Sequence, residues 1–354
     1  MDENAGCVLE QDMNNPEIIS EEPVIGGFWR RLGAFVLDMI VLGILGQILG
    51  YFFFDQLAAM GAWGRLFGWT ISVSYFGTMN SRLGSGQTLG KRLLDIVVVD
   101  DTGSLISVQK SLFRSALLFT PMFLNGAAIP TDKIPTFFNY MLGFVIFGGI
   151  AVIFYLFVFN RRTRQNIHDL AVQTYVIKKS VTQIPVKKRI WTVHYAICGL
   201  LCVIVLVLSH LLMGLSKSET RKGIFEARSE IVRETEIENV SLMVGRTSFV
   251  SKDKRTDQTY AFSQVVVSKK PVEPEAFMTK VATIILHSYP PALKKDFIRV
   301  VVTYGFDIGI AKRHSSYSGV YSPAQWLEKQ HGANSADKMK SGEKAPDEKG
   351  GSNE

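Results

Sequence analysis

The chain has 354 residues, of which 47% are hydrophobic and 20% are charged, and its formal net charge at neutral pH is +7. Uncharged apolar runs gather in the first 216 residues, whereas lysine, glutamate and aspartate dominate afterwards, which predicts a membrane region followed by a hydrophilic domain. The basic residues cluster beside an apolar run without an aromatic-basic RNA motif or a zinc-ligand spacing, so the charge argues against nucleic-acid binding.

The chain begins with an acidic tail. Residues 1–25 contain seven acidic residues and no lysine or arginine, the opposite of the basic start of a signal peptide. We expect this tail to be disordered and cytoplasmic. The apolar run Leu32–Phe54 follows, and it is long enough to cross a bilayer. We therefore expect it to be an uncleaved membrane anchor.

Four further segments have the composition of membrane helices. The segment Ser115–Ile129 is interrupted by Pro121, which leaves a kinked span, a re-entrant segment and an interfacial helix as alternatives. The sequence therefore predicts an α-helical multi-pass membrane domain with four or five transmembrane helices. The other three segments are Leu66–Met79, Phe137–Phe159 and Trp191–Gly214.

The distribution of lysine and arginine predicts the orientation. Residues 160–190 carry eight of these basic residues and only one acidic residue, whereas the connections before the second and fourth apolar segments carry one basic residue each. Positively charged connections stay in the cytoplasm. We therefore expect a cytoplasmic N-terminus, an additional transmembrane helix over residues 190–214 that exits outward, and an extracytoplasmic C-terminal domain.

Residues 219–330 are predicted to form that domain, with a small α+β fold. The segments Ser263–Val267, Phe297–Ile310 and Arg313–Tyr321 are typical of strands, and Glu273–His287 has the apolar spacing of an amphipathic helix. A closing helix over Pro323–Lys329 is expected to bury Trp326, and residues 331–354 are expected to be a disordered tail. No internal repeat is apparent in the sequence.

Three motifs occur in order along the membrane region. The first places Arg31 seven residues before Asp38, the only charged residue inside the first apolar run. The second is Gly86-Gln87-Thr88-Leu89-Gly90-Lys91-Arg92-Leu93-Leu94, which leads into the strand-like Ile96–Val99, and the third is Arg164-Gln165-Asn166-Ile167-His168-Asp169-Leu170-Ala171. Together they resemble the RDD family of bacterial membrane proteins over about residues 26–178, within a predicted domain of residues 26–180.

The resemblance implies a multi-pass protein of the bacterial cytoplasmic membrane with a role around the transport of small ions or other ligands. The arginine and the two aspartates that name the family would be Arg31, Asp38 and Asp169 by position. One interpretation of these three residues is an ion-pair network that fixes the helices in register. The other is a cation or proton site, because intramembrane acids that face a bundle interior can exchange a proton for an ion.

The neighbouring motif residues have simpler interpretations. Gly90-Lys91 does not belong to a phosphate-binding loop, because Ser85 and Arg92 stand where that motif needs a glycine and a hydroxyl-bearing residue. We expect Gly86 and Gly90 to allow close backbone packing, with Lys91 and Arg92 reaching lipid phosphates. His168 either titrates near neutral pH or is a satisfied interfacial histidine.

No nucleophile elbow, zinc motif or hydrolase signature occurs, so we expect no enzymatic activity, cofactor or metal. The two remaining functions are transport and a non-catalytic anchor that presents an extracytoplasmic sensing or protein-interaction domain, with transport slightly favoured. The expected partners are the lipid bilayer, a small cation or proton, and a protein that binds the C-terminal domain. The oligomeric state is left open.

Overall fold

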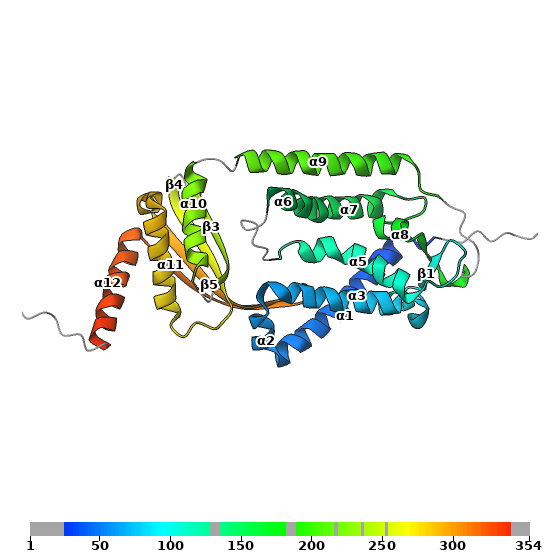
Figure 1. Cartoon of the computed structure of the whole chain (residues 1–354), viewed down its shortest axis with the longest axis horizontal. Coiled ribbons are helices and arrows are strands. Elements are labelled where there is room, and N and C mark those ends of the chain that lie inside the picture. The colour runs from blue at the N-terminus through cyan, green and yellow to red at the C-terminus, as the bar shows by residue number, and fades with distance from the viewer. Residues whose placement is uncertain are drawn as a thin grey trace, which may run out of the picture. The chain divides into compact units, whose positions relative to one another are not determined.

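The computed structural model describes residues 25–127, 135–181, 189–215, 219–234, 237–251 and 254–340 (Figure 1). The predicted acidic tail lies outside the described residues except for Ile25, which forms an isolated bridge with Ile177. The chain divides into two compact units. The first comprises Met1–Asp38, Ser74–Leu118 and Val152–Cys198, and the second comprises Met39–Val73, Phe119–Ala151 and Gly199–Glu354.

Among the residues that the structure describes, three apolar helices are long enough to cross a membrane. They are α1 (Phe28–Phe52), the continuous helix Thr136–Phe159, and Val193–Leu211 within α9 (Val193–Leu215). The second of these consists of α6 (Thr136–Gly143), the π-helical stretch η3 (Phe144–Gly148) and α7 (Gly149–Phe159). The apolar segments predicted at 32–54, 137–159 and 191–214 are thus confirmed as helices of spanning length and composition.

The other two predicted spans form shorter helices. Helix α3 (Gly64–Met79) has 16 residues and α5 (Val108–Leu124) has 17, whereas about 20 residues are needed to cross the hydrocarbon layer. Helix α5 begins before the predicted Ser115 and continues through Pro121, and residues 128–134 lie outside the described part. A short helix α2 (Phe54–Ala59) follows α1. The structure therefore supports three spans by length and leaves the predicted four or five as a prediction.

Two segments of the first unit share one structure. Residues 86–100 and residues 164–178 each contain a five-residue helix followed by a five-residue strand: α4 (Leu89–Leu93) and β1 (Ile96–Asp100), then α8 (Ile167–Ala171) and β2 (Thr174–Lys178). In each segment a glutamine amide donates to the carbonyl of the first strand residue, over 2.9 Å from Gln87 and 3.0 Å from Gln165. Each segment also follows a pair of longer helices in the chain, α1 and α3 or α5 and α6–α7.

The equivalence extends to the backbone. Thr88 and Asn166 are the N-caps of the two short helices, and Asp95 and Gln173 take the same left-handed conformation between helix and strand, with φ of 51° and 52°. The antiparallel β1–β2 ladder is symmetric about one pair of equivalent valines, Val98 and Val176.

The expectation that the chain has no internal repeat is therefore wrong at the level of structure. It failed because the two segments share backbone conformation and hydrogen bonds but very few identical side chains. The repeat makes Lys91 and Asp169 equivalent positions, each the third residue of its short helix. One position thus carries a base in the first copy and an acid in the second.

The C-terminal part of the second unit is an α+β domain with a four-stranded sheet in the order β3-β4-β5-β6. Strands β3 (Ile237–Ser251) and β4 (Lys254–Val267) are antiparallel, β4 and β5 (Phe297–Asp307) are parallel, and β5 and β6 (Lys312–Tyr321) are antiparallel. Helix α11 (Pro274–Ser288) makes the crossover between the parallel strands, as such pairs require. The predicted helical-then-α+β order is confirmed.

Helices α10 (Glu219–Val232), α11 and α12 (Pro323–Lys340) accompany the sheet (Figure 1). The core contains apolar side chains of α10, α11 and one face of the sheet, together with Trp326, which is fully buried and donates to the carbonyl of Ile298 over 3.0 Å. The prediction that Trp326 is buried is confirmed. Helix α12 continues to Lys340 and so enters the segment expected to be disordered from residue 331; residues 341–354 lie outside the described part.

Candidate functional site

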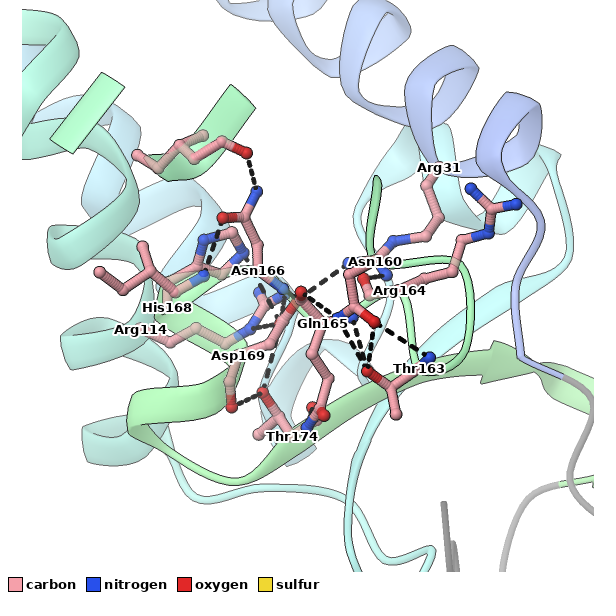
Figure 2. Close-up of polar contacts among 12 residues, drawn as sticks. Arg31, Arg114, Asn160, Thr163, Arg164, Gln165, Asn166, His168, Asp169 and Thr174 are labelled. Atoms are coloured by element: carbon pink, nitrogen blue, oxygen red, sulfur yellow. Dashed lines mark hydrogen bonds and ion pairs between the residues drawn. The ribbon is translucent and has the colours of Figure 1, made fainter. Parts of the chain in front are cut away.

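The first buried acid is Asp169, on the short helix α8, and it pairs with two arginines (Figure 2). Its carboxylate lies 2.9 Å from Nη2 of Arg31 on α1 and 2.8 Å from Nε of Arg114 on α5. It also accepts from the backbone N–H of Asn166 over 3.0 Å, which completes a capping box with the Asn166 side chain. A single carboxylate thus forms ion pairs with arginines of two helices and caps a third helix.

The loop before α8 holds this acid in position. Arg31 also donates to the carbonyl of Arg164. The Asn160 amide donates to the Thr163 hydroxyl over 2.8 Å and to the carbonyl of Gln165 over 2.9 Å, so the turn between α7 and α8 is closed by its own side chains (Figure 2). Because the loop is fixed in this way, the carboxylate of Asp169 faces both guanidinium groups.

The charges of this cluster follow from burial and neighbours. Burial alone would raise the pKa of Asp169, but the positive charges of Arg114 and Arg31 outweigh it and hold that pKa well below its usual value. His168 lies beside it, with Nε2 3.6 Å from Oδ1 of Asp169. Burial lowers the pKa of His168 to about 3, so this histidine is neutral at physiological pH and does not titrate near neutrality.

Asp38, the second buried acid, has a different set of partners. Its carboxylate accepts from the Tyr75 hydroxyl over 2.9 Å, from the backbone N–H of Gly90 over 2.9 Å and from the Thr88 hydroxyl over 2.5 Å. None of the ion pairs of the described residues includes Asp38. The structure therefore pairs Arg31 with Asp169, whereas Asp38 fixes the start of α4.

The glycines of the second motif allow close packing, as predicted. A side chain on Gly90 would overlap the carbonyl of Ala34 on α1, so only glycine lets this backbone approach Asp38. Gly86 has φ of +69°, and a Cβ there would lie 2.8 Å from side-chain atoms of Leu105 and Val97.

The prediction that Lys91 reaches lipid phosphates is wrong. Its side chain is buried, and Nζ donates to Oδ1 of Asn80 at the end of α3. The helical turn explains the difference, because Lys91 and Arg92 point to different sides of α4. Arg92 is exposed and donates to the carbonyl of Gly84 over 3.2 Å, so its contact with lipid stays a prediction.

Lys91 lies in the electrostatic field of both acids. Burial, followed by the positive charge of Arg114, lowers the pKa of Lys91 well below its usual value, while Asp38 and Asp169 act in the opposite direction. No ion pair in the described part of the chain includes Lys91. The amine is thus a buried base that is held by the amide oxygen of Asn80, while both acids have other hydrogen-bond partners.

Three buried polar atoms of this unit have no hydrogen-bond partner among the described residues: Nδ2 of Asn80, Oγ of Ser111 and Nδ1 of His168. The same part of the chain contains no group of three or more metal-ligating side chains. Sequence reasoning missed Arg114, because it was counted only as part of the positive charge bias. Like Arg31, Arg114 directly precedes the apolar part of a helix, and this shared position could have indicated a similar role.

A comparison with family models matches the part of the chain that contains this site. Residues 25–173 match the model of the RDD family. This range contains all three motifs. Searches of curated proteins and of solved structures found no match. The match is therefore to the RDD family over residues 25–173, and the helix α9 and the C-terminal domain lie beyond it.

Proposed function

We propose that this protein couples the movement of a small ion across a bacterial cytoplasmic membrane to a proton, and that Lys91 is the residue that gains and loses it. The observation that carries the proposal is the buried amine of Lys91, which has an amide partner but no ion-pair partner among the described residues.

A proton-exchanging group must occur in both protonation states near neutral pH. Asp169 does not meet this requirement, because its two arginines keep its pKa far below that range. His168 does not meet it either, because it stays neutral above a pKa of about 3. Lys91 is the remaining candidate, since burial lowers its pKa well below the usual value and the charges of Asp38 and Asp169 act in the opposite direction.

The internal repeat supports the same proposal. Many secondary transporters are built from structural repeats, and their ion sites lie where the repeats meet. Here the equivalent positions Lys91 and Asp169 carry opposite charge. Asp169 raises the pKa of their common neighbour His168, and Lys91 lowers it. The orientation that we propose follows the lysine and arginine bias, with a cytoplasmic N-terminus and an extracytoplasmic C-terminal domain.

Proteoliposomes that contain a pH-sensitive dye test this function. Sodium, potassium or lithium gradients are imposed on vesicles carrying the full chain, Lys91→Met or Arg92→Met. Arg92→Met is the matched control, because it removes the adjacent base, which is exposed. We expect cation-dependent proton movement with the unchanged chain and the control, and its loss with Lys91→Met. Exchange that survives Lys91→Met, or no exchange with any of these cations, would refute the proposal.

The second candidate is a non-catalytic anchor that presents the C-terminal domain to a protein partner. The donors that surround both acids favour it, because Asp38 and Asp169 then serve only to fix the short helices. So does the extent of the C-terminal domain, whose core also includes Ala58 of α2. The same vesicles separate the two functions, since an anchor moves no protons and its Lys91→Met variant differs from the unchanged chain only in stability.

A further inference from the structure

The β5–β6 hairpin of the C-terminal domain ends in an apolar tip, residues 308–311. Ile308 is fully buried, and Ile310 and Ala311 are each 8% exposed. The tip is closed by a hydrogen bond from the Ile308 N–H to the Ala311 carbonyl over 3.0 Å. The N–H of Gly309 is taken up by Oδ1 of Asp307 over 2.8 Å. Apolar, buried side chains at the end of a hairpin indicate that the tip is packed against another part of the chain.

One partner of the tip is a row of glycines on α1. A Cβ at Gly46 would lie 2.7 Å from that of Ala311, and one at Gly50 would overlap the ring of Phe306. Gly43 is the third member, with the carbonyl of Ile310 at 3.7 Å from the same hypothetical atom. These glycines form a notch in the helix that larger side chains would fill.

The second partner is a pair of glycines on α3. A Cβ at Gly64 would lie 3.0 Å from the carbonyl oxygen of Asp307, and one at Gly68 would overlap the carbonyl of Ile308. Gly309 has φ of +78°, and a Cβ there would lie 2.4 Å or more from the ring of Phe123 at the end of α5. The tip is thus enclosed by backbone and side chains of three helices.

Polar contacts hold the hairpin where it meets the helices. Nη2 of Arg65 lies 2.7 Å from Oδ2 of Asp307, and Nη1 of the same arginine donates to the carbonyl of Phe123. The hydroxyl of Tyr304 donates to Oδ1 of Asp55 on α2 over 2.7 Å. Asp307 and Tyr304 belong to β5, whereas Arg65 and Asp55 belong to α3 and α2, so these two contacts join parts of the chain that are far apart in sequence.

We propose that the tip of the β5–β6 hairpin is a re-entrant element that enters the lipid layer alongside α1 and α3 and fastens the C-terminal domain to the membrane helices. Gly43 lies nine residues before the end of α1 at Phe52, which is about 14 Å along a helix. The tip residue Ile310 adjoins Ile40, Ile44 and Ile48, the face of α1 that is exposed and therefore faces lipid in a membrane helix.

Non-helical backbone is tolerated at this depth only where protein covers it. The notch supplies that cover, and Asp307 and Ala311 satisfy two of the backbone N–H groups of the tip. The charged pair Arg65–Asp307 marks the point where the hairpin leaves the apolar layer, because both side chains are partly exposed. The domain is therefore part of the membrane structure and not a module on a free tether.

Thiol accessibility tests this arrangement in the full chain, with Cys7, Cys198 and Cys202 replaced by serine. The protein is placed in phosphatidylcholine nanodiscs, in which both membrane faces are open to a charged maleimide. Ile308→Cys reports on the tip, and Ser315→Cys, on the exposed strand β6, is its control. We expect the tip cysteine to react at least ~100-fold more slowly than the control, as buried groups that need local opening do.

A second comparison fills the space left by the glycine pair of α3. Gly68→Leu, combined with Ile308→Cys, places a side chain where the tip carbonyl lies, so the reaction rate should rise to within about tenfold of Ser315→Cys. Gly199→Leu is the matched helical control, because a Cβ there has nothing within 4 Å and should leave the rate unchanged. Equal rates for the tip and strand cysteines would overturn the proposal, whether or not Gly68→Leu folds. A tip that stays protected in the Gly68→Leu variant would overturn the role of the glycine pair on α3.

Discussion

Replacing Asp169 with asparagine keeps the shape of the side chain but removes the negative charge shared by two arginines. Arg31 is 9% exposed and Arg114 is 4% exposed, so neither guanidinium can recover its hydration without opening the structure. Breaking a buried ion pair from one side costs about 3–5 kcal/mol. We expect a loss of that size in the free energy of unfolding of the full chain.

The assay is heat and denaturant unfolding of the purified protein in detergent micelles, followed by tryptophan fluorescence. Glu234→Gln is the matched control, because it also neutralises one acid of an ion pair, Glu234–Lys280, at 2.7 Å. In that pair the side chains are 34% and 58% exposed, so its loss should cost about 0–1 kcal/mol. The difference between the two variants isolates the effect of burial.

A triple replacement of Arg31, Arg114 and Asp169 by leucine extends the test. Removing these three charges together should be less damaging than removing only the acid, because neither guanidinium is then left without its counter-ion. The reasoning is refuted if Asp169→Asn falls within about 1 kcal/mol of the Glu234→Gln control, or if the triple variant is less stable than the single one.

Three further predictions concern other residues. Because burial depresses the pKa of His168 from 6.5 to about 3, stability should be constant above about pH 6.5 and fall by roughly 1.4 kcal/mol per unit as pH drops toward 3, a slope that His168→Asn should reduce in unfolding titrations. Gly90→Ala should lower the melting temperature, because its Cβ overlaps the carbonyl of Ala34, whereas Gly199→Ala should not. Trp326→Ala should destabilise the C-terminal domain by about 3–5 kcal/mol in denaturant titrations, since the ring is fully buried.

Hydropathy was sufficient to predict the long helices, because a lipid-facing surface needs apolar residues regardless of what packs on the other side. Strand β1 and helix α11 could also be predicted, since their patterns are local. The hydrogen-bond partners of Asp38 could not be predicted from the sequence. Helical periodicity indicates which face carries the acid, but not that the start of α4, fifty residues later, supplies the donors.

The same limit explains the elements that were missed. Strand β3 and helix α10 each bury a few apolar residues among many polar ones, and their stability depends on contacts with β4 and α11. Such long-range contacts cannot be predicted from a short segment of the sequence. The hairpin tip was missed for another reason: Ile308 and Ile310 resemble the end of an ordinary buried strand, and only the glycines of α1 and α3 show what receives them.

The pairing of Asp169 with Arg31 also bears on the order of biosynthesis. The two residues are 138 positions apart. At a synthesis rate of about 5–20 residues per second, Asp169 is therefore added roughly 7–28 s after Arg31. The interval between the synthesis of Arg114 and that of Asp169 is shorter, and β1 can pair only after β2 has been synthesised. In a nascent chain that stops before Asp169, the guanidinium groups of Arg31 and Arg114 therefore lack this counter-ion, so both ion pairs form only after the third motif has been synthesised.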